Sequence, residues 1–391
     1  MVIQANPAQP AVTEFKPERF DQVQAGTGIS TKANRRTGIE RDFRLIQNYI
    51  EHRGLALPNL SGTTETIGNN EKNREICDNP LMTHDPLHCN FLGLEFNTPL
   101  VLLSGCVGFG EEYTRVKGFD HRDVGAVCLK GTTLEPRLGN TPHRICETPA
   151  GMLNAIGLQN PGAEYVVNRI LPQLDFTETR FIANVSGSTV EEYAQVTRLF
   201  DQSPVDAIEI NISCPNVKRG GVAFGNDPEM SARVVEVCRQ ATTKPLITKL
   251  SPNQTDISAN ARRCIDAGTD AFATINTLMG MRIDIDNRKP IIGNNQGGLS
   301  GPAIKPVALL RTHQVYQVCK PHAIPIIGQG GITTANDALE FLIAGASVVG
   351  IGTALFYDPL VCKTINTGIR EYLETHHLSR IDELVGTLEL N

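Results

Sequence analysis

Residues 206–216, DAIEINISCPN, contain an apolar, β-branched run that ends abruptly in polar residues and a proline. Such a run predicts a buried strand that carries functional side chains at its carboxyl end. Cys214 lies there between two amide side chains, those of Asn211 and Asn216. From the residues alone, this cysteine could be a nucleophile, a metal ligand or a base that abstracts a proton.

Seven further runs share this apolar, β-branched character and alternate with segments of helical spacing. The eight runs are PLVLLSG (99–105), GAVCLKG (125–131), FIANVSG (181–187), AIEINIS (207–213), PLITKLS (245–251), AFATINT (271–277), IPIIGQG (324–330) and SVVGIGT (347–353). Helical spacing is clearest at residues 190–200, 228–241, 257–267 and 335–344. Eight strand–helix units predict an α/β fold, a closed (β/α)8 TIM barrel.

The first 95 residues differ from the rest because they are polar and begin with a Pro-rich stretch. One amphipathic segment, residues 39–52, places Ile39, Phe43, Ile46 and Ile50 on one helical face. We therefore expect an N-terminal extension over residues 1–95 and the barrel over residues 96–391. The extension is interpreted as a helix packed outside the barrel or as a subunit contact.

Composition limits the possible partners and the cellular location. The 391 residues carry a formal net charge of -6, which argues against nucleic acid and anionic membranes as partners. No apolar run approaches the roughly 20 residues of a membrane span, and the opening residues lack the order of a secretory signal. We expect a cytoplasmic protein. The ten cysteines form no CxxC pair, so no metal or iron–sulfur site is predicted.

Two long connections, residues 131–162 and 278–302, follow the second and sixth predicted strands. Both fall on the face where the carboxyl ends of barrel strands meet, which is where such barrels carry their active sites. Long connections with ordered turn chemistry are often lids over a site. Lids are therefore expected at this face.

Glycines at the ends of the last two strands predict a phosphate site. IIGQGGIT (326–333) and VVGIGTALF (348–356) bring Gly330, Gly331, Gly352 and Thr353 to the same face. Glycine allows main-chain N–H groups to approach an anion closely, and the amino termini of the following helices add favourable dipoles. Together the two motifs predict a phosphorylated ligand.

Lysine and asparagine side chains supply the other polar groups of this face. Lys130 ends the second strand and Lys249 the fifth, where they could stabilise a carboxylate and an anionic ring, respectively. The asparagines expected on the same rim are Asn154, Asn184, Asn211, Asn216 and Asn276. An amide offers a donor and an acceptor in one plane, which suits the edge of a pyrimidine.

These motifs closely resemble those of dihydroorotate dehydrogenases, from about residue 89 to the carboxyl terminus. The matching stretches are SGCVGFGEEY (104–113), LKGTTLEPRLGNTPHR (129–144), GMLNAIGLQNPG (151–162), IANVSGSTVEEY (182–193), NISCPN (211–216), GGVAFGNDP (220–228), GGLSGPAIKP (297–306) and IGTAL (351–355). The resemblance is closest to the catalytic subunit of the NAD-linked, two-subunit class, in which the base is a cysteine. The membrane-bound, quinone-linked class carries serine there.

The resemblance implies FMN as the cofactor. Its phosphate would be held by Gly330, Gly331, Gly352 and Thr353. The residues implied around its ring and ribityl chain are Ser104, Lys130, Gly131, Asn184, Asn211, Lys249, Ile275 and Gly301. Those implied for the substrate are Lys130, Asn154, Ala155, Ile156, Gly157, Leu158, Asn211, Asn216, Asn276 and Thr277.

The implied reaction is oxidation of (S)-dihydroorotate to orotate in de novo pyrimidine (UMP) biosynthesis. Cys214 would abstract the C5 proton while hydride leaves C6 for FMN, and Lys249 would offset the charge of the reduced flavin. An ordinary thiol has a pKa near 8.5, so the rate is expected to rise with pH. The class further implies a homodimer core and a partner subunit with FAD and a 2Fe–2S cluster, which passes electrons to NAD+.

Three alternatives remain open at this point. A dihydropyrimidine dehydrogenase would reduce uracil or thymine, but that family usually places histidine where Asn216 follows Pro215. Fumarate could replace NAD+ as the electron acceptor. A barrel that binds FMN without redox activity would be a scaffold and not an enzyme.

Overall fold

A closed barrel of eight parallel strands forms the centre of the protein. The computed structural model describes residues 85–391 except residue 112 and residues 213–224. In the order of their pairing around the barrel, the strands are β10 (Ala271–Thr274), β15 (Ile326–Gln329), β16 (Val348–Ile351), β3 (Leu100–Leu102), β4 (Ala126–Cys128), β7 (Arg180–Val185), β8 (Ala207–Asn211) and β9 (Leu246–Leu250). Each strand overlaps one of the eight predicted runs. The predicted (β/α)8 barrel is confirmed.

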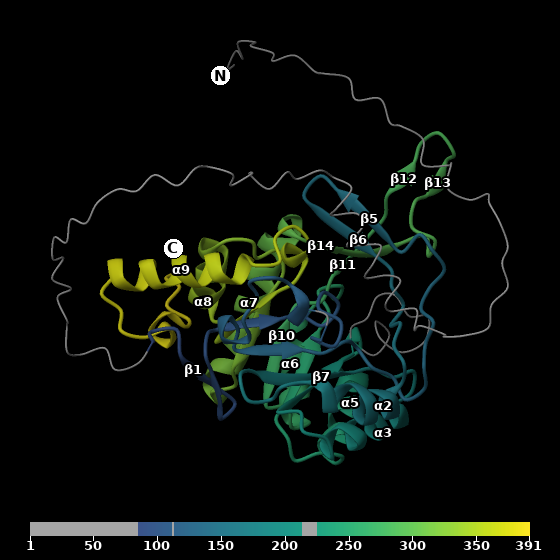
Figure 1. The fold of residues 1–391 in the computed structure, drawn as a ribbon, viewed down its shortest axis with the longest axis horizontal. Coiled ribbons are helices and arrows are strands. Elements are labelled where there is room, and N and C mark those ends of the chain that lie inside the picture. Colours follow the sequence, from purple (N-terminus) through teal and green to yellow (C-terminus); the bar gives the residue numbers. More distant parts are fainter. Residues whose placement is uncertain (1–84, 112, 213–224) are drawn as a thin grey trace, which may run out of the picture. The chain divides into compact units, whose positions relative to one another are not determined.

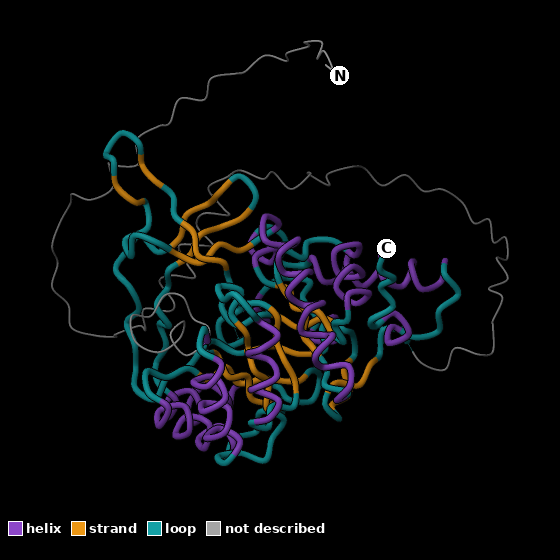
Figure 2. Tube along the Cα trace, turned by 180° about the vertical axis from the view of Figure 1, so that it is seen from behind, coloured by secondary structure: helices purple, strands orange, loops and turns teal. Residues whose placement is uncertain are grey.

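Helices follow the strands and surround the barrel (Figures 1 and 2). The longer ones are α3 (Val190–Asp201), α5 (Pro228–Arg239), α6 (Ile257–Asp266), α7 (Lys305–Cys319), α8 (Ala335–Ala344) and α9 (Val361–Thr375). The short helical turns are η1 (Tyr113–Arg115), η2 (His121–Asp123), α2 (Ala163–Tyr165), η3 (Val166–Ile170), η4 (Leu171–Gln173), η5 (Pro302–Ile304), η6 (Lys320–His322), η7 (Thr353–Phe356) and η8 (Ile381–Leu384). Within the described residues, no helix is both long and apolar enough to cross a bilayer.

Side-chain caps fix where several of these helices begin. Thr189, Asp227, Asp256 and Thr334 each accept a hydrogen bond from a backbone N–H of the first turn of the helix that follows. Such caps satisfy donors that have no partner within the helix. The helices begin where the sequence pattern predicts them because these capping residues interrupt the apolar periodicity.

An antiparallel hairpin precedes the barrel and packs at the amino-terminal ends of its strands. It consists of β1 (Cys89–Phe91) and β2 (Leu94–Phe96). Phe96 is fully buried, and Arg180, the first residue of β7, donates to the carbonyl of Glu95. The expected boundary after residue 95 falls inside β2, and the division of the chain at that point stays a prediction. The amphipathic segment at residues 39–52 lies outside the described residues.

The two long connections form a sheet that the sequence analysis did not predict. β5 (Ile145–Thr148) and β6 (Gly151–Asn154) come from the first connection, whereas β11 (Leu278–Gly280) and β14 (Gly297–Ser300) come from the second. The four antiparallel strands pair in the order β11-β14-β6-β5. The hairpin of β12 (Ile283–Asp284) and β13 (Lys289–Pro290) extends from the second connection (Figure 1). We call the four-stranded sheet the cover sheet.

Glycine permits the close approach of β6 and β14 within the cover sheet. A Cβ atom on Gly151 would lie 2.0 Å from the carbonyl oxygen of Ser300. No real Cβ atom tolerates that distance, so a larger residue would push the two strands apart. The pairing of the two connections therefore depends on glycine at this position.

We predict that Gly151→Ala opens the cover sheet without unfolding the barrel. Overpacking of this kind costs about 1–3 kcal/mol, and the sheet can open locally. Amide hydrogen exchange of β6 and β14 should become at least about tenfold faster, with a small change in the temperature of global unfolding. Ala150→Ser, which adds one atom to the exposed neighbouring residue, is the matched control. Unchanged exchange in Gly151→Ala would contradict the prediction.

Candidate active site

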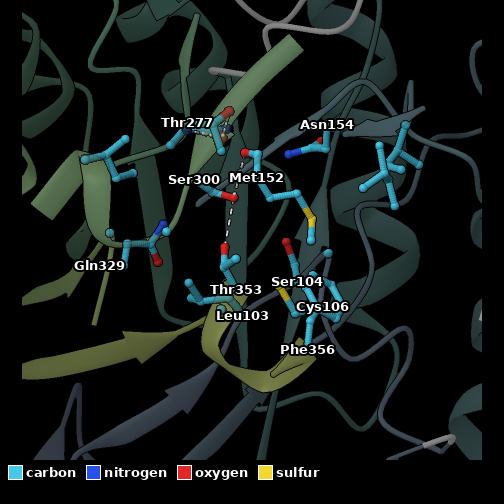
Figure 3. A pocket seen from close by; sticks show the side chains of 18 of the residues that line it. Leu103, Ser104, Cys106, Met152, Asn154, Thr277, Ser300, Gln329, Thr353 and Phe356 are labelled. Carbon is cyan, nitrogen blue, oxygen red and sulfur yellow. Dashed lines mark hydrogen bonds between the residues drawn. The ribbon is translucent and has the colours of Figure 1, made fainter. Parts of the chain in front are cut away.

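A cavity of about 860 Å³ lies between the carboxyl ends of the barrel strands and the cover sheet. Its wall includes Leu103 and Lys249 from the barrel side, and Met152 and Ser300 from the cover sheet. The Ser300 hydroxyl is hydrogen-bonded to the Thr353 hydroxyl at 2.8 Å (Figure 3). This contact joins the cover sheet to the loop that follows β16.

Most of the residues predicted from the sequence line this one cavity. They are Ser104, Lys130, Gly131, Asn154, Ile156, Gly157, Leu158, Asn211, Lys249, Ile275, Asn276, Thr277, Gly301, Gly330, Gly331, Gly352 and Thr353. Asn184 and Ala155 are fully buried and do not line it. Cys214 and Asn216 lie outside the described residues.

Lys249 is a buried lysine whose charge is balanced by a buried carboxylate. Its Nζ atom lies 3.5 Å from Oε1 of Glu209, and the two side chains are only 8% and 1% exposed. A buried charge is costly unless it is paired and hydrogen-bonded. Because Lys249 lines the cavity and Glu209 does not, a bound ligand would meet the positive member of the pair.

Three asparagines connect the cavity to the same carboxylate. Asn276 Nδ2 donates to Asn211 Oδ1 at 3.3 Å, and Asn211 Nδ2 donates to Asn184 Oδ1 at 3.4 Å. Asn184 Nδ2 in turn donates to Glu209 Oε1. Strand register explains this sequence of contacts, because Asn184 is the β7 residue that pairs with Glu209 of β8. Asn184 therefore does not line the cavity itself but orients Asn211, which does.

Two cysteines near this cluster are neutral thiols at neutral pH. Burial raises the pKa of Cys106 to about 11, although the positive charges of Lys130 and Lys249 oppose the rise. Burial and the neighbouring Glu209 raise the pKa of Cys128 well above its ordinary value. Neither thiol is suited to act as a base near neutral pH.

The glycine loops after β15 and β16 offer main-chain donors to the cavity. In the described part of the chain, the N–H groups of Gly331, Gly352 and Thr353 have no backbone acceptor. Gly331 has a φ of +84°, a conformation that favours glycine. These donors fit an anionic group bound between the two loops.

The two residues just before α8 (Ala335–Ala344) direct their amides to a carboxylate within that helix. The N–H groups of Thr333 and Thr334 both donate to Asp337 Oδ2 at 2.9 Å. Burial alone would raise the pKa of Asp337, but hydrogen bonds from Lys305 and Thr333 lower it to about 2. The amides of the two residues that precede α8 are therefore already bonded to a carboxylate of that helix. After β16 the chain forms the short turn η7 instead of an α-helix.

The pairing of Glu209 with Lys249 was not predicted from the sequence. The signal was present, because Glu209 is the one charged residue within the apolar β8 and shares a strand face with Asn211. Gln329 was also missed. It lines the cavity, its Nε2 donates to the carbonyl of Ile275, and its buried Oε1 has no partner within the described residues.

Comparison with known proteins places the chain in one family. The sequence profile described as "Dihydroorotate dehydrogenase" matches residues 86–373. A protein of Pelobacter propionicus named "Dihydroorotate dehydrogenase B (NAD(+)), catalytic subunit" is 51% identical over 301 residues, which is 77% of this chain and 97% of the relative. Proteins of the same name are 50% identical over 295 residues in Geobacillus kaustophilus (75% and 93%) and 48% identical over 310 residues in Geotalea daltonii (79% and 100%). These matches confirm the resemblance seen in the motifs, and the chain belongs to the dihydroorotate dehydrogenase family.

Proposed function

We propose that this chain is the catalytic subunit that oxidises (S)-dihydroorotate to orotate in de novo pyrimidine biosynthesis, with FMN as its cofactor. The observation that carries the proposal is the cavity wall, in which Lys249, Asn211 and Asn276 lie together with the glycines proposed to hold a phosphate. A redox-silent scaffold would not require a buried lysine beside the ring site. The family match and the relatives' shared name support the same reaction.

The cavity fits FMN at both ends. The N–H groups of Gly331, Gly352 and Thr353 suit the phosphate, together with Gly330. Gly105 lines the cavity with no heavy atom within 4 Å of an added Cβ, which leaves room for a flat ring to approach. The remaining residues proposed for the ring and ribityl chain are Ser104, Lys130, Gly131, Asn184, Asn211, Lys249, Ile275 and Gly301, with Asn184 acting through Asn211. FMN, when bound, accepts the hydride that leaves C6 of the substrate.

Substrate recognition is assigned to polar side chains on two sides of the cavity. Asn211, Asn276 and Thr277 lie on the barrel side, and Asn154 lies on β6 of the cover sheet. Lys130 lines the cavity and provides a positive charge for the substrate carboxylate. Residues 155–158 and Asn216 complete the proposed set. Asn154 Nδ2 also donates to the carbonyl of Gly298 at 3.3 Å, so its orientation depends on the cover sheet.

Cys214 is proposed as the base that accepts the C5 proton. In the sequence it follows closely after β8, the strand that carries Asn211 to the cavity, and it lies outside the described residues. Cys106 also lines the cavity, but its pKa of about 11 leaves almost no thiolate at neutral pH. Lys249 would supply a positive charge that offsets the negative charge of the reduced flavin.

We predict that Cys214→Ala slows reduction of the bound flavin by dihydroorotate by about 10²–10⁴-fold, the usual contribution of a general base. The rate in the native chain should rise with pH, because only the thiolate accepts a proton. Stopped-flow absorbance under anaerobic conditions from pH 6 to 9 measures both effects. Cys106→Ser should keep the pH dependence. A flat profile in the native chain, or loss of the profile in Cys106→Ser alone, would reject Cys214 as the base.

The rival reaction is the reduction of uracil or thymine. Neither compound carries a carboxylate, so this reaction does not need the positive charge of Lys130. We predict that Lys130→Met weakens orotate binding by about 10- to 100-fold, since a hydrogen bond to a charged group contributes about 1.5–3 kcal/mol. Binding of uracil, which lacks the carboxylate, should change much less. Titration of the flavin absorption spectrum with each compound measures this. Equal losses for both ligands would favour the rival.

The name of the relatives, catalytic subunit, implies a separate partner subunit. We propose that the partner carries FAD and a 2Fe–2S cluster, joins a homodimer of this chain in a heterotetramer, and passes electrons to NAD+; fumarate is the alternative acceptor. The β12–β13 hairpin supports a contact surface beside the cavity, because Met281, Ile283 and Ile285 are 55%, 55% and 82% exposed. Arg282, between two of them, lines the cavity and donates to the carbonyl of Glu147.

We predict that Ile285→Asp weakens assembly with the co-expressed electron-transfer subunit and lowers NAD+-dependent turnover at least about tenfold, because a buried charge replaces apolar contact area. Reduction of FMN by dihydroorotate, measured without the partner, should be unchanged. Leu310→Asp on α7, where Leu310 is 56% exposed, is the matched control. Normal assembly of Ile285→Asp would remove the hairpin from the contact surface.

The extension of residues 1–95 is proposed as a subunit contact or as a helix on the outside of the barrel. The family match begins at residue 86, so nearly all of the extension lies outside it. Removal of residues 1–79, followed by measurement of assembly size and turnover, separates the two possibilities.

A further inference from the structure

Glu209 is a buried carboxylate that does not reach the cavity. It is 1% exposed, lies within β8 and does not line the cavity. Its Oε1 atom receives three donors, namely the amide of Asn184, the thiol of Cys128 at 3.5 Å and the ammonium of Lys249 at 3.5 Å. With Lys249 it forms a buried ion pair.

The cluster around Glu209 contains one negative and one positive charge. Cys128 remains a neutral thiol because its pKa is raised well above the ordinary value. Asn184 contributes only a dipole. The two charges therefore offset each other, but only Lys249 reaches the cavity wall. The Glu209 carboxylate therefore partly offsets the positive charge that Lys249 presents to a ring bound in the cavity.

The direction of the amide chain is fixed by the same carboxylate. Asn276 donates to Asn211, Asn211 donates to Asn184, and Asn184 donates to Glu209. A carboxylate can only accept, so it sets which end of the Asn184 amide faces it and thereby orients the next amide along the chain. Glu209 thus controls the orientation of groups that it does not touch.

We propose that Glu209 is a positioning residue that anchors Lys249 and partly offsets its charge, and thereby holds the reduction potential of the bound FMN below the value that an unpaired Lys249 would give. This inference rests on the proposed function, because it requires FMN beside Lys249. Reduction adds negative charge to the ring, and a carboxylate behind the lysine opposes that change. The thermodynamic driving force of the flavin step is therefore set partly from outside the cavity.

The test compares the FMN-loaded native chain with Glu209→Gln, which removes the charge and keeps the shape. The reduction potential is measured by anaerobic titration against a reference dye. The expected result is a more positive potential, equivalent to a ratio of reduced to oxidised FMN on the order of tenfold higher at a fixed dye potential. Asp206→Asn is the matched control, because Asp206 is a partly buried carboxylate just before β8 that lies 3.6 Å from Arg180 and accepts from the N–H of Phe181. Both variants should lose thermal stability, but only Glu209→Gln should shift the potential.

A second variant, Glu209→Asp, keeps the carboxylate charge. Its potential should lie close to the native value. A potential in Glu209→Gln that is unchanged or more negative would overturn the inference, and so would an equal positive shift in Asp206→Asn. If Glu209→Gln does not fold, a native potential in Glu209→Asp supports the inference and a positive shift as large as tenfold contradicts it. Failure of the native chain to bind FMN, or to be reduced by dihydroorotate, would instead reject the proposed function.

Discussion

A lysine ammonium enclosed by a barrel needs a counter-charge, and the pairing of Lys249 with Glu209 meets this need. Both side chains lie on fully buried strands of the barrel, so the barrel itself fixes them in place. The asparagine chain ends on the same carboxylate. Most of the polar order on this side of the cavity therefore depends on one buried ion pair. Removal of either partner would leave a charge that the interior cannot solvate.

The cover sheet supplies the second wall of the cavity, opposite the ends of the barrel strands. A (β/α)8 barrel has a packed interior, and its sites form above the carboxyl ends of its strands. Here two connections pair across the barrel mouth, so the cavity has a wall of backbone hydrogen bonds in place of mobile loops. The Ser300–Thr353 contact ties that wall to the proposed phosphate end, and Asn154 faces Gly298 across the β6–β14 pairing. Ligand recognition thus depends on both layers.

The barrel and most of the cavity wall could be predicted from the sequence because their signals are local. Buried parallel strands form continuous apolar runs, and Lys130, Lys249 and the glycines stand at the ends of such runs. The cover sheet could not be predicted, since its strands are short and Gly-rich and pair residues such as Asn154 and Gly298 that lie 144 positions apart. The bonding of the Thr333 and Thr334 amides to Asp337 was missed for a related reason. An acidic residue in the first turn indicates a cap, but not that it takes the donors from a ligand.

The central claim is that dihydroorotate delivers its electrons to FMN held in this cavity. The most direct measurement is anaerobic mixing of the purified, FMN-loaded chain with (S)-dihydroorotate while the yellow absorption of the flavin is followed. This half-reaction needs neither the partner subunit nor an external electron acceptor. Rapid bleaching with formation of one orotate per flavin is the predicted result. Stable bound FMN that dihydroorotate does not bleach would contradict the claim.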